Sequence, residues 1–152
     1  MRVIIDADAC TSKGVIEEVA RRHNIKVLLV ADTSHLIDTG DNVRAIIVDK
    51  APQETDIAII NRASKNDIVV TQDYGLASLV LGKGAYAISP RGFLFSERSI
   101  SRMLNSRHIA SRVRRGGGRT KGPRVYSKQD MKRFARNLER LISQLQVGEV
   151  SC

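Results

Sequence analysis

Short runs of Ile, Val, Leu and Ala recur along the first part of the chain, and each has the length of a β-strand. Four such runs lie at 3–5, 26–31, 45–48 and 68–71, and a fifth strand is expected at 85–88, before the turn Ser89-Pro90-Arg91-Gly92. The first four do not alternate cleanly between apolar and polar positions. Because strands that are buried on both faces lack this alternation, we expect helices to cover both sides of the sheet.

Helical spacing of apolar residues fills the intervals between these runs. It is clear in 12–23 and weaker in 56–65, and in 74–81 it produces a stripe of Leu76, Leu79 and Val80. Helices that alternate with strands predict βαβ units and a mainly parallel sheet. The fold class expected from the pattern is therefore α/β.

The C-terminal helix has the clearest pattern in the chain. Ser127 and Asp130 have the spacing of a capping box. The apolar stripe that follows, which we interpret as packing on the sheet, consists of Met131, Phe134, Ala135, Leu138, Leu141, Ile142 and Leu145. A basic helix is also expected at 97–110. We expect one domain over 1–152, with a βα core at 1–90, a basic and partly irregular segment at 91–126 and the C-terminal helix at 127–147.

Charge is distributed unevenly along this chain, whose formal net charge is +9. Residues 1–90 contain 10 Lys and Arg against 12 Asp and Glu, whereas residues 91–152 contain 15 against 4. The asymmetry predicts an acidic site beside a basic surface, for which phosphates are natural ligands. There is no apolar run of the roughly 20 residues that span a bilayer, no signal-peptide pattern and no disulfide framework. We expect a soluble, cytoplasmic protein that has no membrane partner.

Aspartates follow the ends of the expected strands. Asp6, Asp32, Asp49 and Asp73 stand at or just after the apolar runs, and Asp8 follows Asp6 by two positions. The carboxyl ends of parallel strands share one edge of a sheet, where ligands bind near the switch in strand order. Two carboxylates about 4 Å apart repel by roughly 4 kcal/mol at an effective dielectric of about 20. A cluster of them must protonate, separate or bind a cation, and oxygen-only ligands select Mg²⁺ or Mn²⁺.

Three of these aspartates are interpreted as functional. Asp6 follows a buried strand directly, and an extended backbone turns the side chain of Asp8 the same way. Asp73 ends another buried strand. The structural alternative is that Asp8 and Asp73, which both precede expected helices, are helix caps.

The other aspartates have structural interpretations of at least equal weight. Two interpretations of Asp56 are left open: a metal ligand, or an acid that the helix dipole favours in an early helical turn. Asp32 and Asp49 are interpreted as turn residues. The histidines His23, His35 and His108 are scattered, and His23 is interpreted as a structural residue on its helix.

The segment 107–124 contains seven Lys and Arg residues and no acid. Its three consecutive glycines at 116–118 disfavour regular structure, and they are not a Walker loop, because no Gly-Lys-Ser/Thr follows. We expect a nucleic-acid arm that contacts the phosphate backbone, with a solvated loop as the alternative for any one arginine. The candidate nucleic-acid contacts, which include one arginine from the turn after the fifth strand, are Arg91, Arg112, Arg114, Arg115, Arg119, Lys121 and Arg124.

Four stretches together resemble the YaiI/YqxD family of bacterial proteins. They are Asp6-Ala-Asp-Ala-Cys10, Asp67-Ile-Val-Val-Thr-Gln-Asp-Tyr-Gly-Leu-Ala77, Pro90-Arg-Gly92 and Gly117-Gly-Arg-Thr-Lys-Gly-Pro123. The family is similar to PIN-like nuclease domains, three-layer α/β/α folds whose clustered acids hold Mg²⁺ or Mn²⁺ for phosphodiester hydrolysis. The resemblance implies a PIN-like fold with a C-terminal helix. It also implies that Asp6, Asp8 and Asp73 form the acidic site, with Asp56 as the helix acid.

Two positions depart from the expected family pattern. Thr11 replaces the usual proline after the cysteine, and the stretch Gln53-Glu-Thr-Asp56 has one acid fewer than the family motif. The second departure removes one candidate metal ligand from the helix that carries Asp56.

The function expected from these features is that of a divalent-metal-dependent phosphodiesterase, a nuclease acting on RNA or single-stranded nucleic acid. Its catalytic residues would be Asp6, Asp8 and Asp73. One alternative is a non-catalytic nucleic-acid-binding module of the same fold, so whether the chain is an enzyme is left open. Another is a phosphatase of the haloacid dehalogenase type. Against the phosphatase, Cys10 stands where that motif has Thr or Val, and no later Gly-Asp-x-x-x-Asp occurs.

Overall fold

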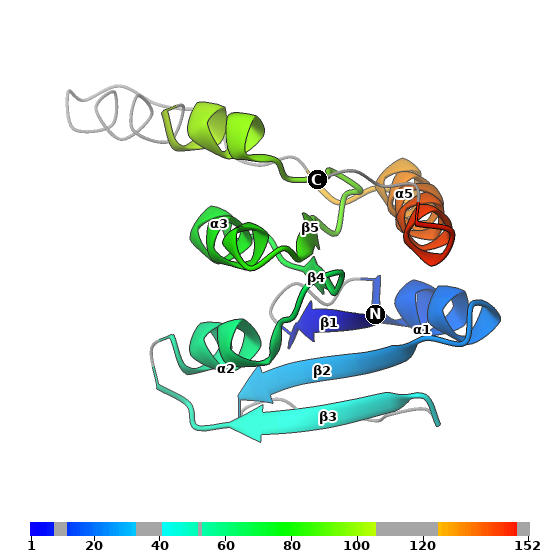
Figure 1. The fold of residues 1–152 in the computed structure, drawn as a ribbon, viewed down its shortest axis with the longest axis horizontal. Helices are drawn as coiled ribbons and strands as arrows, with labels where there is room; N and C mark the ends of the chain where they lie inside the picture. Colours follow the sequence, from blue (N-terminus) through cyan, green and yellow to red (C-terminus); the bar gives the residue numbers. More distant parts are fainter. Residues whose placement is uncertain (8–11, 33–40, 52, 106–124, 149–152) are drawn as a thin grey trace.

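The described part of the chain contains a five-stranded parallel sheet with helices on both faces in this computed structural model (Figure 1). The structure describes residues 1–7, 12–32, 41–51, 53–105 and 125–148. The strands are β1 (Arg2–Asp6), β2 (Lys26–Asp32), β3 (Val43–Val48), β4 (Ile68–Val70) and β5 (Tyr86–Ile88). The helices are α1 (Lys13–Arg22), α2 (Glu54–Arg62), α3 (Tyr74–Gly82) and α5 (Lys128–Gln146). Residues 97–105 form a further helical segment without a label.

The strand order is β3-β2-β1-β4-β5, so the chain first builds outward from β1 and then returns to its other side. The reversal lies between β1 and β4, where Ile5 and Val70 are register partners. In doubly wound sheets, ligands bind outside the carboxyl ends of the strands beside such a reversal. The fold therefore places the end of β1 at the position where a ligand site is expected.

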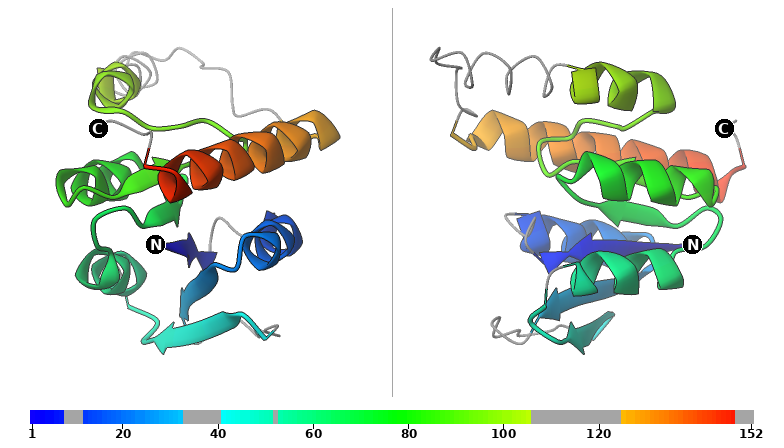
Figure 2. Two further views of the ribbon diagram at one scale, coloured as in Figure 1. Left: turned by 45° about the vertical axis from the view of Figure 1, so that its right-hand side comes forward. Right: turned by 90° about the vertical axis from the view of Figure 1, so that its left-hand side faces the viewer.

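Alternate residues of the strands pack into two separate cores. Val3 and Ile5 of β1 join Phe134 of α5 and residues of α1 in one core. Ile4 of β1 joins residues of α2, α3 and the segment 97–105 in the other. Figure 1 shows α2 and α3 on one side of the sheet and α1 and α5 on the other, and the turned views of Figure 2 agree. The expected three-layer α/β/α fold is confirmed, and α5 forms part of one layer.

Local signals set the helix boundaries. At the start of α5, Ser127 and Asp130 form the expected capping box, in which each side chain accepts a hydrogen bond from the backbone N–H of the other residue. Asp73 caps α3 through a hydrogen bond that its Oδ1 accepts from the backbone N–H of Leu76 at 3.1 Å. Helix α1 ends before Asn24, whose φ of 56° lies in the left-handed region that asparagine tolerates.

Three expectations about burial are wrong. Strand β3 is not covered on both faces, since it lies at the sheet edge and its Ile47 is 51% exposed. Leu79 of α3 is 56% exposed, because Leu76, Ala77 and Val80 form the arc that faces the core. Met131 is 38% exposed and lies in the first turn of α5, before the buried part of its stripe begins. Within the described residues, no helix has both the length and the apolarity that crossing a bilayer requires.

Candidate functional site

Asp6 is the last residue of β1 and is only 6% exposed. The alternation of side chains puts it on the same face as Ile4, toward α2 and α3. Its Oδ2 accepts a hydrogen bond at 3.2 Å from Oγ1 of Thr71, the fully buried residue that follows β4. A buried polar contact therefore joins the carboxyl ends of the two strands between which the order reverses.

Thr71 also positions the next aspartate. Its Oγ1 accepts a hydrogen bond from the backbone N–H of Asp73 at 3.1 Å, and Asp73 in turn caps α3. We call Asp6, Thr71 and Asp73 the switch-point cluster. The sequence pattern does not single out Thr71, although one signal was present: a hydroxyl residue directly after a wholly apolar strand, on the face that Asp6 shares.

The cap is the structural alternative that the sequence left open for Asp73. It commits Oδ1 of the carboxylate to the backbone of Leu76 and holds the side chain beside the end of β4. A capping carboxylate has a second oxygen, so capping and metal binding are compatible roles for one aspartate. The structure thus confirms the capping role and leaves the catalytic role a prediction.

The other acids of the carboxyl edge come from neighbouring elements. Asp56 lies in the first turn of α2, where the helix dipole favours an acid. Asp32 ends β2 and is partly buried, and Asp49 is exposed just after β3. Among the described residues, no three Asp, Glu, His or Cys side chains are grouped closely enough to hold a metal ion. Asp8 lies outside the described residues, so the expected ligand set stays a prediction.

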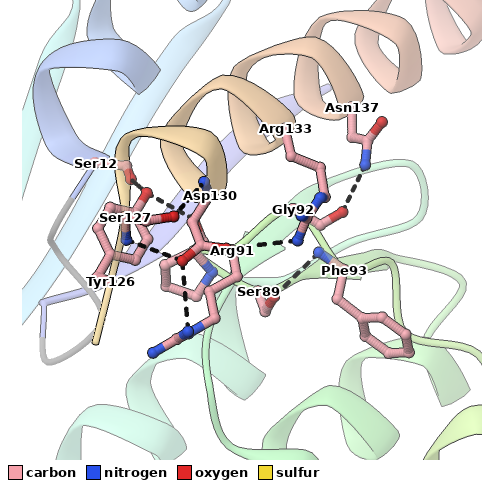
Figure 3. A network of polar contacts seen from close by, with 11 residues as sticks. Ser12, Ser89, Arg91, Gly92, Phe93, Tyr126, Ser127, Asp130, Arg133 and Asn137 are labelled. Atoms are coloured by element: carbon pink, nitrogen blue, oxygen red, sulfur yellow. Dashed lines mark hydrogen bonds and ion pairs between the residues drawn. The ribbon is translucent and has the colours of Figure 1, made fainter. Parts of the chain in front are cut away.

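A second polar network joins the turn after β5 to the start of α5 (Figure 3). Nη1 of Arg91 lies 3.4 Å from Oδ2 of Asp130, and the guanidinium lies 6.0 Å from the centre of the Tyr126 ring. The Tyr126 hydroxyl donates a hydrogen bond to the carbonyl oxygen of Pro90 at 2.9 Å and lies 2.6 Å from Oγ of Ser12. This tyrosine connects the start of α1 with the turn after β5.

Asp130 is the buried centre of this network. Its carboxylate pairs with Arg91 and also with Nη1 of Arg133 at 3.5 Å, and it accepts the backbone N–H of Ser127 at 2.9 Å. Arg91, which the sequence suggests as a phosphate contact, therefore also has a structural partner. The capping box was visible in the sequence, but the ion pair was not, because its partners lie 39 positions apart.

Gly92 explains why the motif Pro90-Arg-Gly92 ends in glycine. Its φ is +89°, and a Cβ at this position would lie 2.8 Å from main-chain atoms of Arg133 and Phe134 in α5. Nδ2 of Asn137 donates a hydrogen bond to the carbonyl oxygen of Gly92 at 2.7 Å. The lack of a side chain lets the backbone of α5 approach the turn, so the motif docks α5 onto the sheet. We call Arg91, Gly92, Tyr126, Asp130 and Arg133 the α5 network.

The stretches that build both sites lie within one family match. The model of the family described as "Uncharacterized BCR, YaiI/YqxD family" matches residues 4–144. The chain belongs to the YaiI/YqxD family. Similar relatives, each called a UPF0178 protein, occur in clostridia. One from Clostridium kluyveri is 44% identical over 142 residues, which are 93% of each chain.

Two further relatives also match this YaiI/YqxD chain over most of their length. A UPF0178 protein from Clostridium perfringens is 42% identical over 145 residues, 95% of this chain and 97% of the relative. One from Lachnoclostridium phytofermentans is 46% identical over 133 residues, 88% of this chain and 86% of the relative. No solved structure matches the chain. The family resemblance is confirmed, and the likeness to PIN-like nucleases stays a prediction.

Several residues that the sequence selects in this YaiI/YqxD protein lie outside the described residues. Besides Asp8, they are the candidate nucleic-acid contacts Arg112, Arg114, Arg115, Arg119, Lys121 and Arg124. His23 lies at the end of α1, with Nε2 at 3.2 Å from Glu139 and Nδ1 at 3.1 Å from Gln146, both in α5. Its interpretation as a structural residue is confirmed, because it links two helices of one layer.

Proposed function

We propose that this YaiI/YqxD protein is a divalent-metal-dependent phosphodiesterase that acts on RNA or single-stranded nucleic acid. Its centre lies at the carboxyl ends of β1 and β4, with Asp6, Asp8 and Asp73 as catalytic residues and metal ligands. Asp56 of α2 is a further ligand. The observation that carries the proposal is the buried hydrogen bond between Asp6 and Thr71, at the reversal of the strand order.

The donor chemistry of the switch-point cluster suits Mg²⁺ or Mn²⁺. Asp6 and Asp73 offer carboxylate oxygens, which hard divalent cations prefer. Asp6 is only 6% exposed, and the attraction between opposite charges is stronger away from bulk water. When bound, such an ion lowers the pKa of a coordinated water and neutralises charge that develops on the phosphate oxygens.

Thr71 is a positioning residue in this proposal. It donates to the carboxylate of Asp6 and accepts from the backbone of Asp73, so one hydroxyl relates the two acids to each other. Outer hydrogen bonds of this kind orient ligands and tune their affinity. The Thr71 side chain should therefore matter for activity even though it makes no contact with the reacting phosphate.

The basic residues provide the phosphate contacts in this proposal. Arg112, Arg114, Arg115, Arg119, Lys121 and Arg124 would neutralise the backbone of the nucleic acid and release counterions. Arg91 is also kept as a phosphate contact. Its side chain is 32% exposed, and a guanidinium carries five N–H donors, which suits it to serve Asp130 and a phosphate together.

A non-catalytic nucleic-acid-binding module is the second candidate. The observation that favours it is the cap of α3, because this role accounts for Asp73 without a metal. A protein of this kind would bind RNA equally well with and without a divalent metal and would cleave nothing.

The test compares wild type with Asp73→Asn on panels of RNA and DNA in Mg²⁺ or Mn²⁺. Asparagine caps helices as well as aspartate does, so the variant keeps the start of α3 while it loses a carboxylate. We expect wild type to cleave single-stranded RNA and the variant to be slower by roughly 100-fold or more, with an unchanged circular dichroism spectrum. Equal cleavage by both proteins would assign the activity to a contaminant. RNA binding without cleavage in either metal would support the second candidate.

A further inference from the structure

A cleft of about 690 Å³ is lined in part by the two residues that flank Asp73 of the switch-point cluster. The lining comes from Gln72 and Tyr74, from residues 89–95 after β5, from Met103 of the segment 97–105, and from α5. Figure 3 shows Phe93 on the turn and Arg133 and Asn137 on α5. The volume lies within the range of roughly 300–1,000 Å³ that is typical of small-molecule sites.

The cleft is cationic. Arg91, Arg133 and Arg140 line it, and none of the described residues that line it is an Asp or Glu. Asp130 offsets part of this charge, since it pairs with Arg91 and Arg133 from a fully buried position. Arg140 is exposed and has no ion-pair partner in the described part of the chain. The charge of the walls therefore favours an anionic ligand.

Aromatic rings form the apolar part of the same cleft. Phe95 is 6% exposed and lies between two other rings, with centroid distances of 6.1 Å to Tyr74 and 5.6 Å to Phe93. Phe93 is 40% exposed and forms a T-shaped contact with Phe95, at an interplanar angle of 84°. A buried ring thus supports an exposed one. Because a T-shaped contact involves at most one face of a ring, the contact with Phe95 leaves a face of Phe93 for stacking with a planar ligand.

We propose that this cleft binds one nucleotide of a single-stranded nucleic acid, with the base stacked on Phe93 and the phosphate held by Arg133 and Arg140. A ligand that is only anionic would use the arginines and not the rings. A ligand that is only apolar would use the rings and not the arginines. A nucleotide joins a planar ring to a phosphate, and single-stranded nucleic acid is bound in general by aromatic stacking within a basic groove.

The position of the cleft relates it to the proposed centre. Gln72 and Tyr74 adjoin Asp73 on both sides, so a strand whose nucleotide occupies the cleft passes next to the switch-point cluster. In this respect the inference rests on the proposed function, because it identifies where the substrate is held beside the phosphodiester to be cut. Binding itself does not require cleavage and is measured without metal.

The experiment measures the anisotropy of a fluorescein-labelled ten-nucleotide single-stranded RNA with the full chain in EDTA. Phe93→Ala should weaken binding by about 5- to 150-fold, the loss of one base–aromatic stack. Phe93→Leu, which keeps an apolar side chain without a ring, should weaken binding similarly and separates stacking from folding. Arg140→Gln should lower the log–log salt slope by about 0.7. Arg136→Gln, an exposed arginine of the same helix outside the cleft lining, is the matched control and should leave the slope unchanged.

Wild-type binding by the Phe93 variants and by Arg140→Gln would overturn the proposal. A competition assay is the second criterion. If polyglutamate displaces the RNA as effectively as adenosine monophosphate does, the cleft recognises negative charge alone or acidic peptides, and the proposal is overturned. Failure of the proposed function looks different. RNA that binds through Phe93 but is never cut with Mn²⁺ refutes the phosphodiesterase and supports the cleft. Cleavage with an unchanged KM in Phe93→Ala refutes the cleft and leaves the phosphodiesterase standing.

Discussion

The two halves of the carboxyl edge use buried aspartates in different ways. In the α5 network, Asp130 is fully buried and pairs with the guanidinium groups of Arg91 and Arg133. In the switch-point cluster, Asp6 is also buried and accepts a hydrogen bond from the hydroxyl of Thr71. The guanidinium partners of Asp130 offset its charge, whereas the hydroxyl of Thr71 orients the carboxylate of Asp6.

This difference teaches that burial alone does not identify a functional acid. Both regions carry family motifs, and the sequence suggests a function for residues of each, Asp6 in one and Arg91 in the other. The contacts of Arg91 and Gly92 show that their motif, Pro90-Arg-Gly92, docks α5 onto the sheet. The contact between Asp6 and Thr71 joins the ends of two strands at the reversal of the strand order, where doubly wound sheets bind ligands. The elements that each contact joins separate the two cases: a helix and a turn for Asp130, and two strand ends for Asp6.

The largest effect is expected in the α5 network. Gly92→Ala should lower the free energy of unfolding by about 2–5 kcal/mol, because overpacking against α5 adds to the strain of a positive φ. The change is measured by urea denaturation. Gly14→Ala is the control, since a Cβ at this position in α1 meets no atom within 4 Å, and it should raise stability by up to about 1 kcal/mol. Equal stability of Gly92→Ala and wild type would show that α5 does not depend on this close approach.

A pair of Asp→Asn substitutions compares the two regions directly. Asp130→Asn removes the charge that Arg91 and Arg133 share and should lower the free energy of unfolding by about 1.5–3 kcal/mol. Asp73→Asn keeps a helix cap and should change the free energy of unfolding by no more than about 0.5 kcal/mol. Thermal or urea unfolding of both variants measures the difference. If Asp73→Asn destabilises as strongly as Asp130→Asn, the switch-point cluster is a structural network like that of α5.

A metal titration tests the switch-point cluster. Mn²⁺ at ten times its dissociation constant should stabilise wild type by about 1.4 kcal/mol, because a ligand of the native state shifts the unfolding equilibrium. Asp6→Asn should abolish the rise in Tm, whereas Asp49→Asn, at an exposed position after β3, should preserve it. A crystal soaked in Mn²⁺ with no ion among the carboxylates of Asp6, Asp8 and Asp73 would contradict the expected metal site.

The smallest effect on stability is expected in the basic segment 107–124. Changing Arg114, Arg115 and Arg119 together to Ala should lower the log–log salt slope of RNA binding by roughly two units if all three touch phosphate. The free energy of unfolding should change by no more than about 0.5 kcal/mol per substitution, as for exposed side chains. Unfolding of the triple variant, or binding with an unchanged slope, would contradict the role of this segment as a nucleic-acid arm.

Much of the fold could be predicted because it follows from local patterns. Apolar runs and helical spacing placed the five strands and the labelled helices to within a few residues, and the spacing of Ser127 and Asp130 marked the start of α5. These signals reflect the period of side chains along a strand or helix. The same patterns misjudged Ile47, because periodicity does not reveal which strand lies at the edge of the sheet.

The candidate site, too, could be predicted only in part. The order of residues alone indicated that aspartates follow the strands and that family motifs surround them. Only the tertiary structure decided that β1 adjoins β4, so that Thr71 meets Asp6 across 65 positions of the chain, and that Arg91 meets Asp130 across 39. Such contacts depend on how whole elements pack, and packing is a property of surfaces that local propensity does not encode. The sequence determined which elements form, and the packing of those elements determined which of their polar residues meet.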